Sequence, residues 1–267
     1  MLNLILAVAL IGGSNDTIIS IGWDKLGLYV PAGEDAGLPI GVSAFGIGAD
    51  GNIYLYSCAS RTVWVFDMDG GLKRTVETSI PCAWDITANT NGDIYMLVFT
   101  SLKNQSAYVW VKSDRLEWKI AIPDEFVEAR GNGRLHATAD GKVYLEMFFD
   151  GRWHSVELRE GMKSVEWFDL DGRVGWDGEP LRSTFDLPNA FDRDVNGCVY
   201  SVERGFTTSI RKDCENGKSF KGDWIPKMVT DFYDDPYAVS SDGKVFVVIT
   251  DSKGVKILRL NLSDDTF

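Results

Sequence analysis

The chain has 267 residues, of which 45% are hydrophobic and 12% aromatic, so it is large enough to bury a sizeable core. Its 39 acidic and 27 basic residues give a formal net charge of −12, which would repel the phosphates of nucleic acid and of anionic membranes. The composition therefore predicts a folded globular protein and argues against a nucleic-acid partner.

The apolar run Leu2–Ile11 is about half as long as a membrane-spanning helix, which needs ~20 residues, so we predict no integral membrane span. Its length and the Gly-Gly-Ser that follows suit a secretory signal, although no Lys or Arg precedes it and no clear A-x-A cleavage site follows. We interpret residues 1–14 as a signal-like segment ahead of one domain over 15–267. We expect the protein to be located in the periplasm, at the cell surface or outside the cell. The alternative is a buried N-terminal strand.

Four cysteines make an even count, which allows three disulfide connectivities in an exported chain. Cys198 and Cys214 stand equidistant from Phe206 in an apparent turn, so a hairpin folded there would bring them opposite each other. This spacing predicts the pair Cys198 with Cys214, and elimination leaves Cys58 with Cys82. Four buried free thiols are the alternative for a cytosolic protein.

A turn followed by a strand recurs five times along the chain, as in "ADGNIYLY" at 49 and "VNGCVYSV" at 195. The turn glycines recur at intervals of 41 to 56 residues, and they are Gly51, Gly92, Gly141, Gly197 and Gly243. Six residues before four of them stands a large residue, here called the anchor: Phe45, Leu135, Phe191 or Tyr237. In the second copy Trp84 stands eight residues ahead, which we interpret as a two-residue insertion.

Each copy predicts a small sheet with two apolar faces, because Asp-Gly and Asn-Gly pairs favour tight hairpins and both sets of alternating residues are largely apolar. Identical neighbouring sheets can cover both faces, and a ring of such blades is a β-propeller. We therefore predict an all-β fold, a β-propeller whose closing blade is shared between C-terminal strands and the segment Thr17–Val30. Six blades are favoured over five, because Phe168–Gly172 echoes Phe66–Gly70 and indicates a degenerate blade.

The stretch Pro39–Glu77 has the pattern DG-x-IY, a short loop and a V-x-VFD-x-DG ending, and it resembles an NHL-repeat blade. The resemblance covers most of residues 39–260 and is faint between 150 and 190. It implies a five- or six-bladed propeller near the gluconolactonase-like and peptide-lyase propellers. It carries no function over, since such repeats serve enzymes and binding modules alike.

Functional sites of propellers lie around the central channel, where the innermost strands begin. Residues expected there are Ser43, Cys82, Arg134, Asn189 and Asp235, with His136, Asp85 and Asp192 slightly further along. If Asp85, Asn189 and Asp235 converge, they supply the oxygen ligands that calcium prefers. The alternative is a set of polar residues that hydrate a narrow channel, and Ser43 or Ala44 stands where lactonase-like propellers carry a glutamate.

The two histidines are too few for a zinc or haem site by themselves. His136 is the candidate general base, because it precedes the third turn near the axis, whereas His154 is expected to be a packing residue. Most of the nine tryptophans lie in alternating strands and are expected in the core, with Trp176 as the expected exposed exception.

The leading hypothesis is a binding module outside the cytoplasm, without a catalytic set, that recognises a protein, peptide or glycan. The alternative hypothesis is a calcium-assisted hydrolase or lyase, lactonase-like, with its site in the central channel. Calcium is the one cofactor that the second hypothesis would require.

Overall fold

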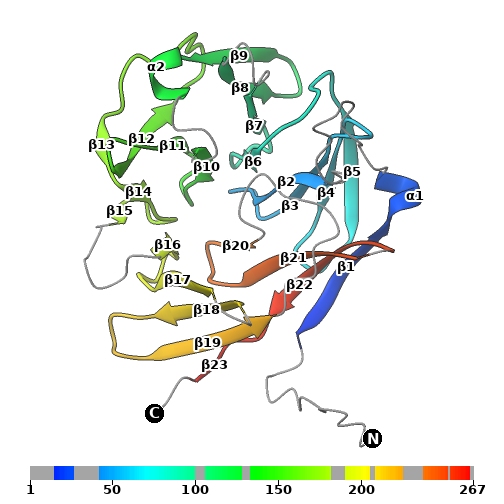
Figure 1. Ribbon diagram of the computed structural model, residues 1–267, viewed down its shortest axis with the longest axis vertical. Coiled ribbons are helices and arrows are strands. Elements are labelled where there is room, and N and C mark those ends of the chain that lie inside the picture. Colours follow the sequence, from blue (N-terminus) through cyan, green and yellow to red (C-terminus); the bar gives the residue numbers. More distant parts are fainter. Residues whose placement is uncertain are drawn as a thin grey trace, which may run out of the picture.

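The computed structural model of the chain describes residues 15–26, 42–99, 106–127, 133–181, 190–204, 208–224, 237–251 and 253–264. These residues form antiparallel sheets arranged as a ring around a common axis, so the predicted all-β propeller is confirmed (Figure 1). The described helices, α1 (Trp23–Leu26) and α2 (Asp124–Val127), have one turn each. Neither helix has the length and apolarity that crossing a bilayer requires.

Five sheets of four or five strands make up the ring. Blade 1 contains β2 (Val42–Ile47), β3 (Ile53–Ser57), β4 (Thr62–Phe66) and β5 (Leu72–Glu77). Blade 2 contains β6 (Asp85–Ala88), β7 (Ile94–Phe99), β8 (Ala107–Lys112) and β9 (Glu117–Ile122). Blade 3 contains β10 (Gly133–Ala137), β11 (Val143–Phe149), β12 (Arg152–Leu158) and β13 (Leu170–Asp171). Blade 4 contains β16 (Ala190–Arg193), β17 (Val199–Arg204), β18 (Thr208–Asp213), β19 (Ser219–Trp224) and β23 (Ser263–Asp264). Blade 5 contains β20 (Tyr237–Val239), β21 (Val245–Asp251), β22 (Gly254–Leu260) and β1 (Asp16–Gly22).

The preferred number of six blades is therefore wrong, and the five-bladed alternative is confirmed. The segment that suggested a sixth blade instead forms a two-stranded sheet of β14 (Arg173–Val174) and β15 (Pro180–Leu181), here called the central hairpin. Its place in the ring is between blades 3 and 4 (Figure 1). The stretch between Asp171 and Ala190 is roughly half as long as blade 1, so it is too short for four strands of ordinary length.

The repeated turns explain why the inner strands of every blade have the same geometry. In blade 1 the Gly48 N–H donates to the Asn52 carbonyl and the Gly51 N–H to the Gly48 carbonyl. Gly51 has a φ of 72°, while Asp50 is not among the described residues with positive φ. This is the pattern of a type I turn followed by a glycine bulge, and it requires glycine at the last turn position. The central hairpin repeats the pattern with a φ of 80° at Gly178.

The anchor of the second repeat is Ile86, so the interpretation of Trp84 as a displaced anchor was wrong. Phe45 pairs with Leu55 in blade 1, and Ile86 pairs with Met96 at the same distance from its own turn glycine. The spacing of six residues therefore holds in blade 2 without an insertion. Ile86 is as large as the anchor Leu135, and the larger ring of Trp84 two residues earlier obscured the regularity.

The ring closes as the sequence predicts, because β1 near the N-terminus pairs with β22 near the C-terminus in blade 5. One pairing was not expected: β23, which follows β22, leaves blade 5 and pairs with β19 as a fifth strand of blade 4. The C-terminal strands therefore join blades 4 and 5.

Four clusters of buried apolar side chains lie between consecutive blades of the ring. Leu97 of blade 2 and Leu145 of blade 3, for example, are fully buried in the same cluster. Burying one such side chain contributes about 1.5 to 3 kcal/mol. Within the described part of the chain, the boundary between blades 3 and 4 has no cluster of this kind, and charged side chains and the central hairpin lie there instead.

Both disulfides predicted from the sequence are present. Cys198 and Cys214 lie at the paired ends of β17 and β18, as expected for a hairpin folded between them. Cys58 and Cys82 join the end of β3 to the segment that leads into β6 and so link blades 1 and 2.

Candidate functional site

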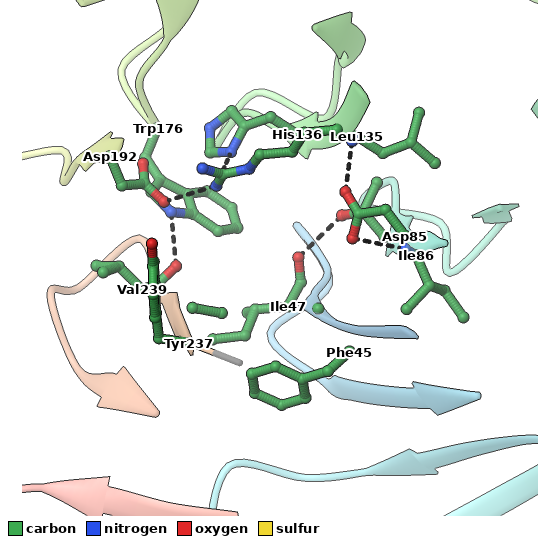
Figure 2. Close-up of a pocket in the computed structure, with 14 residues that line it drawn as sticks. Phe45, Ile47, Asp85, Ile86, Leu135, His136, Trp176, Asp192, Tyr237 and Val239 are labelled. Atoms are coloured by element: carbon green, nitrogen blue, oxygen red, sulfur yellow. Dashed lines mark hydrogen bonds and ion pairs between the residues drawn. The ribbon is translucent and has the colours of Figure 1, made fainter. Parts of the chain in front are cut away.

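The innermost strands meet around a small cavity at the ring centre, shown in Figure 2. Its lining comes from β2, β6, β10, β16, β20 and the central hairpin. The cavity has a volume of about 30 Å³, which leaves room for about two water molecules. Chemistry at this position is therefore limited to water-sized or ion-sized species unless the lining moves.

Arg134 of β10 and Asp192 of β16 form an ion pair across the boundary between blades 3 and 4. Nη2 of Arg134 lies 3.2 Å from Oδ2 of Asp192, and Nη1 donates to the Phe191 carbonyl at 2.7 Å. The backbone N–H of Arg193 donates to the other Asp192 oxygen at 2.8 Å. Both carboxylate oxygens of Asp192 are thus engaged by protein donors.

A second buried ion pair adjoins the first. Glu146 of β11 is directly opposite Arg134 in the strand register, and its Oε2 lies 3.3 Å from Nε of Arg173 and 3.9 Å from Nε of Arg134. Its Oε1 accepts the Val174 N–H at 2.6 Å. The Arg173 guanidinium also lies 4.2 Å from the ring centre of Trp153, a cation–π contact. Two arginines and two carboxylates therefore form one cluster, which we call the central ion cluster.

Burial raises the pKa of the Asp192 carboxyl to about 7, against the opposing effect of Arg134. The backbone N–H of Arg193 also opposes the shift, while Glu146 adds to it through like-charge repulsion. Asp192 therefore exchanges its proton near neutral pH.

His136 of β10 lies beside Arg134, with Nδ1 3.4 Å from Nη2 of that arginine. Because an arginine can only donate, Nδ1 is the acceptor and the proton of the neutral ring is on Nε2. Burial holds the pKa of His136 well below its usual value, and the positive charges of Arg134 and Arg173 lower it further. The Gly175 backbone raises the pKa of His136 and so opposes these effects. Nε2 of His136 is buried and forms no hydrogen bond with a described residue.

Trp176 was expected to be exposed, and that expectation was wrong. The central hairpin carries this side chain into the ring centre, where it is 2% exposed and its Nε1 donates to the Val239 carbonyl of β20 at 2.8 Å (Figure 2). Its ring meets His136 edge-on with 5.2 Å between ring centres. Its backbone accepts from Ala139 of blade 3 and donates to Arg193 of blade 4. Trp176 therefore connects three parts of the ring and fills much of its centre.

The predicted calcium ligands are only partly described. Asp85 lines the cavity, but its Oδ1 accepts the Ile86 N–H at 2.8 Å and its Oδ2 accepts the Leu135 N–H at 2.6 Å. Asn189 and Asp235 lie outside the described residues. In the described part of the chain, no three His, Cys, Asp or Glu side chains form a metal-binding group. The described carboxylates at the ring centre do not fit a calcium ion, since backbone donors and an arginine already occupy their oxygens.

The other residues singled out in the sequence, Cys82, Ser43 and His154, are bonded or packed within the protein. Cys82 is in a disulfide, and Ser43 is fully buried with no partner for its hydroxyl among the described residues. His154 is a packing residue, stacked on Phe149 with 3.9 Å between ring centres, and its Nδ1 lies 3.6 Å from Asp171.

Glu146 and Arg173 were missed by sequence reasoning. One signal was available for Glu146, which is a charged residue in the otherwise apolar strand Val143–Phe149. Such a residue is buried only with a partner. Arg173 gave no comparable signal, because it is on the central hairpin and its partner Glu146 is on blade 3.

No family model matches the chain, and a search of curated proteins found no match. Solved structures similar to it include a streptogramin B lyase, with 15% identity, a TM-score of 0.43 and coverage of 91% of this chain and 100% of that one. A gluconolactonase from Xanthomonas campestris has 11% identity and a TM-score of 0.41, with coverage of 83% and 73%. A calcium-binding protein, regucalcin, from Agrobacterium tumefaciens has 13% identity and a TM-score of 0.37, with coverage of 84% and 78%.

These neighbours are the lyase and gluconolactonase propellers that the resemblance of the first blade implies. Identities of this size and TM-scores below 0.5 carry no information about activity. The propeller fold rests on the strand pairing of this chain.

Proposed function

We propose that the chain is a non-enzymatic binding propeller that recognises a protein, peptide or glycan on an outer surface of the ring. The observation that supports this proposal is the central ion cluster, whose charged groups are paired with one another around a cavity of about 30 Å³. A catalytic centre needs groups that are free to meet a substrate and space for that substrate.

The cluster also has a sufficient structural reason to exist. It occupies the boundary between blades 3 and 4, where the apolar packing found between the other blades is replaced by the central hairpin. Buried charges are tolerated when each has a partner, and here each carboxylate has an arginine and a backbone donor. The charged side chains of the cluster are accounted for without a reaction.

A location outside the cytoplasm is part of the proposal. Two disulfides form in oxidising compartments and are rare in the cytosol. The apolar run Leu2–Ile11, which lies outside the described residues, has the length of a signal segment. Secretion to the periplasm, the cell surface or the medium would agree with both features.

One observation favours a second candidate, a calcium-assisted hydrolase or lyase. Burial raises the pKa of Asp192 to about 7, and Nη2 of Arg134 contacts both Asp192 and the neutral ring of His136, which places a proton donor and a proton acceptor on either side of one guanidinium. This candidate requires calcium ligands, of which Asn189 and Asp235 remain predictions from the sequence.

Two measurements on the purified, chelator-stripped protein separate the candidates. We expect a glycan array or a displayed peptide library to yield a ligand whose binding survives His136→Ala, and calorimetric titration with calcium to give no heat of binding. Calcium binding that is lost in Asp235→Ala, together with hydrolysis of a lactone or ester that is lost in His136→Ala, would contradict the binding proposal.

A further inference from the structure

The connection between β12 and β13 takes an unusual route that holds one tryptophan at the surface. Residues 159–169, here called the crossing segment, leave blade 3 and run along the outer strand β9 of blade 2 before returning to β13. The Ala121 N–H donates to the Lys163 carbonyl, and the Val165 N–H donates to the Ala121 carbonyl, both at 2.9 Å. The short helix α2 and β9 lie at the top of Figure 1, and β12 lies below α2.

Two side chains fix the second half of the crossing segment. Val165 is fully buried in the apolar cluster between blades 2 and 3. Phe168 packs edge-on against Phe126 of α2, with 4.9 Å between ring centres, and against Phe149 of β11 at 5.2 Å. Trp167 lies between Val165 and Phe168 in the sequence. Its side chain is 64% exposed, the largest fraction among the exposed large hydrophobic residues of the described chain.

Single exposed hydrophobic side chains are common on protein surfaces, and Trp167 is the largest and most exposed of those in the described chain. A large aromatic ring left in water forgoes about 1.5 to 3 kcal/mol of burial. Aromatic side chains that are held rigidly at a surface are the typical anchors of binding interfaces, because little conformational entropy is lost when a partner covers them. The contacts of Val165 and Phe168 fix the backbone on both sides of Trp167 at the surface.

The charges around Trp167 indicate what kind of partner would cover it. Glu166 and Asp169 flank it in the sequence with exposed side chains, and neither is ion-paired with a cation of the described chain. Carboxylates outnumber cations three to two in the crossing segment, and one of those cations, Arg159, is already paired with Glu157 at 3.3 Å. The whole chain carries a charge of −12, which attracts cations over a longer range.

We propose that Trp167, Glu166 and Asp169 form the docking surface for an arginine- or lysine-rich segment of a partner protein. An arginine of that segment would lie on the Trp167 ring as a cation–π contact, while neighbouring cations meet the two carboxylates. This inference rests on the proposed binding function and names its ligand class. It does not involve the ring centre.

The test uses the full chain and a fluorescein-labelled peptide of alternating arginine and glycine, measured by fluorescence anisotropy. We expect Trp167→Ala to weaken binding about tenfold or more, as for an interface anchor. The double variant Glu166→Gln/Asp169→Asn should weaken binding and reduce its dependence on salt between about 50 and about 300 mM.

Matched controls distinguish a local surface from general attraction. Leu116→Ala removes another exposed hydrophobic residue, which is 57% exposed, and Asp69→Asn/Asp114→Asn removes the same charge at side chains that are 92% and 95% exposed. Both controls should stay within about twofold of the parent affinity.

Three results would overturn the inference. They are equal binding of a glutamate-glycine peptide, equal losses in the control variants, and a glycan ligand whose binding depends on Trp167. The proposed function would survive all three, since a ligand bound elsewhere or a glycan still makes the chain a binding module. Calcium-dependent turnover would remove the proposed function and leave the peptide measurement unaffected.

Discussion

At the scale of single residues, the ring centre depends on charge pairing across two blades. Arg134 and Arg173 are both close to Glu146, and Arg134 also pairs with Asp192. Removing one partner from such a buried set leaves an unpaired charge and costs about 3 to 5 kcal/mol. Replacing the charged members together by apolar residues of similar volume is often neutral. The cluster therefore holds the geometry in place without making the protein unusually stable.

Asp192 predicts a specific pH dependence of stability. Its pKa is raised to about 7 in the folded chain, above the usual value of the unfolded chain. Its stabilising contribution is therefore present below about pH 4 and is lost as the pH rises to about 7. Compared with Asp192→Asn, the parent should lose up to about 1.4 kcal/mol of unfolding free energy per pH unit in that range.

Urea unfolding at several pH values between about 4 and 8 measures this difference. His136 is present in both proteins, so its own loss of stability on acidification, which follows from its lowered pKa, cancels in the comparison. Asp69→Asn is the control, because that side chain is 92% exposed. Parallel stability curves for the parent and Asp192→Asn would show that Asp192 titrates like an ordinary carboxyl.

At the scale of elements, sequence reasoning succeeded where a local rule decides the structure. The turn glycines and the apolar alternation predicted the inner strands, and the symmetric spacing of Cys198 and Cys214 predicted their disulfide. Sequence reasoning failed where contacts between distant parts of the chain determine the structure. The central hairpin is too short for a strand pattern, and β23 pairs with β19 only because the ring brings them together. The larger Trp84, two residues earlier, obscured Ile86 as the anchor of the second repeat.

Removing the disulfide in blade 4 tests one of these elements. The double variant Cys198→Ser/Cys214→Ser should lose about 3 kcal/mol of unfolding free energy, because the bond closes a loop with a sequence separation of 16. The matched variant Cys58→Ser/Cys82→Ser opens a separation of 24 and should differ from the first by about 0.5 kcal/mol or less.

Guanidinium denaturation of both variants and of the parent, with and without reductant, gives these free energies. The reduced parent should be less stable than either variant, since it loses both bonds. A change below about 1 kcal/mol in the blade 4 variant would show that this bond contributes little.

The same comparison holds for the candidate site. The inner strands predicted that His136 and Asp85 would lie near the axis, and both line the central cavity. The partners of the charged residues at the ring centre were not predictable from the sequence. Asp85 accepts a hydrogen bond from the Leu135 N–H of the next blade. Glu146 contacts Arg173 only because the central hairpin inserts between blades 3 and 4.

At the scale of the whole molecule, the structure assigns different roles to the centre and the outside of the ring. The centre is filled by paired charges and by Trp176, which joins blade 3, blade 4 and β20 through its hydrogen bonds. The outside carries the exposed Trp167, which lies between the buried Val165 and the half-buried Phe168. The proposed function rests on the closed, charge-paired centre, and the further inference about its ligand rests on Trp167.

Hydrogen exchange of the tryptophan indole groups tests this contrast most directly. In nitrogen-edited NMR spectra, with the signals assigned through Trp176→Phe and Trp167→Phe, the Trp176 indole N–H should exchange slowly because it is buried and bonded to the Val239 carbonyl. The Trp167 indole N–H should exchange with water at once. Rapid exchange at Trp176 would mean that the ring centre is open to solvent, and it would contradict the account of a closed centre and a binding periphery.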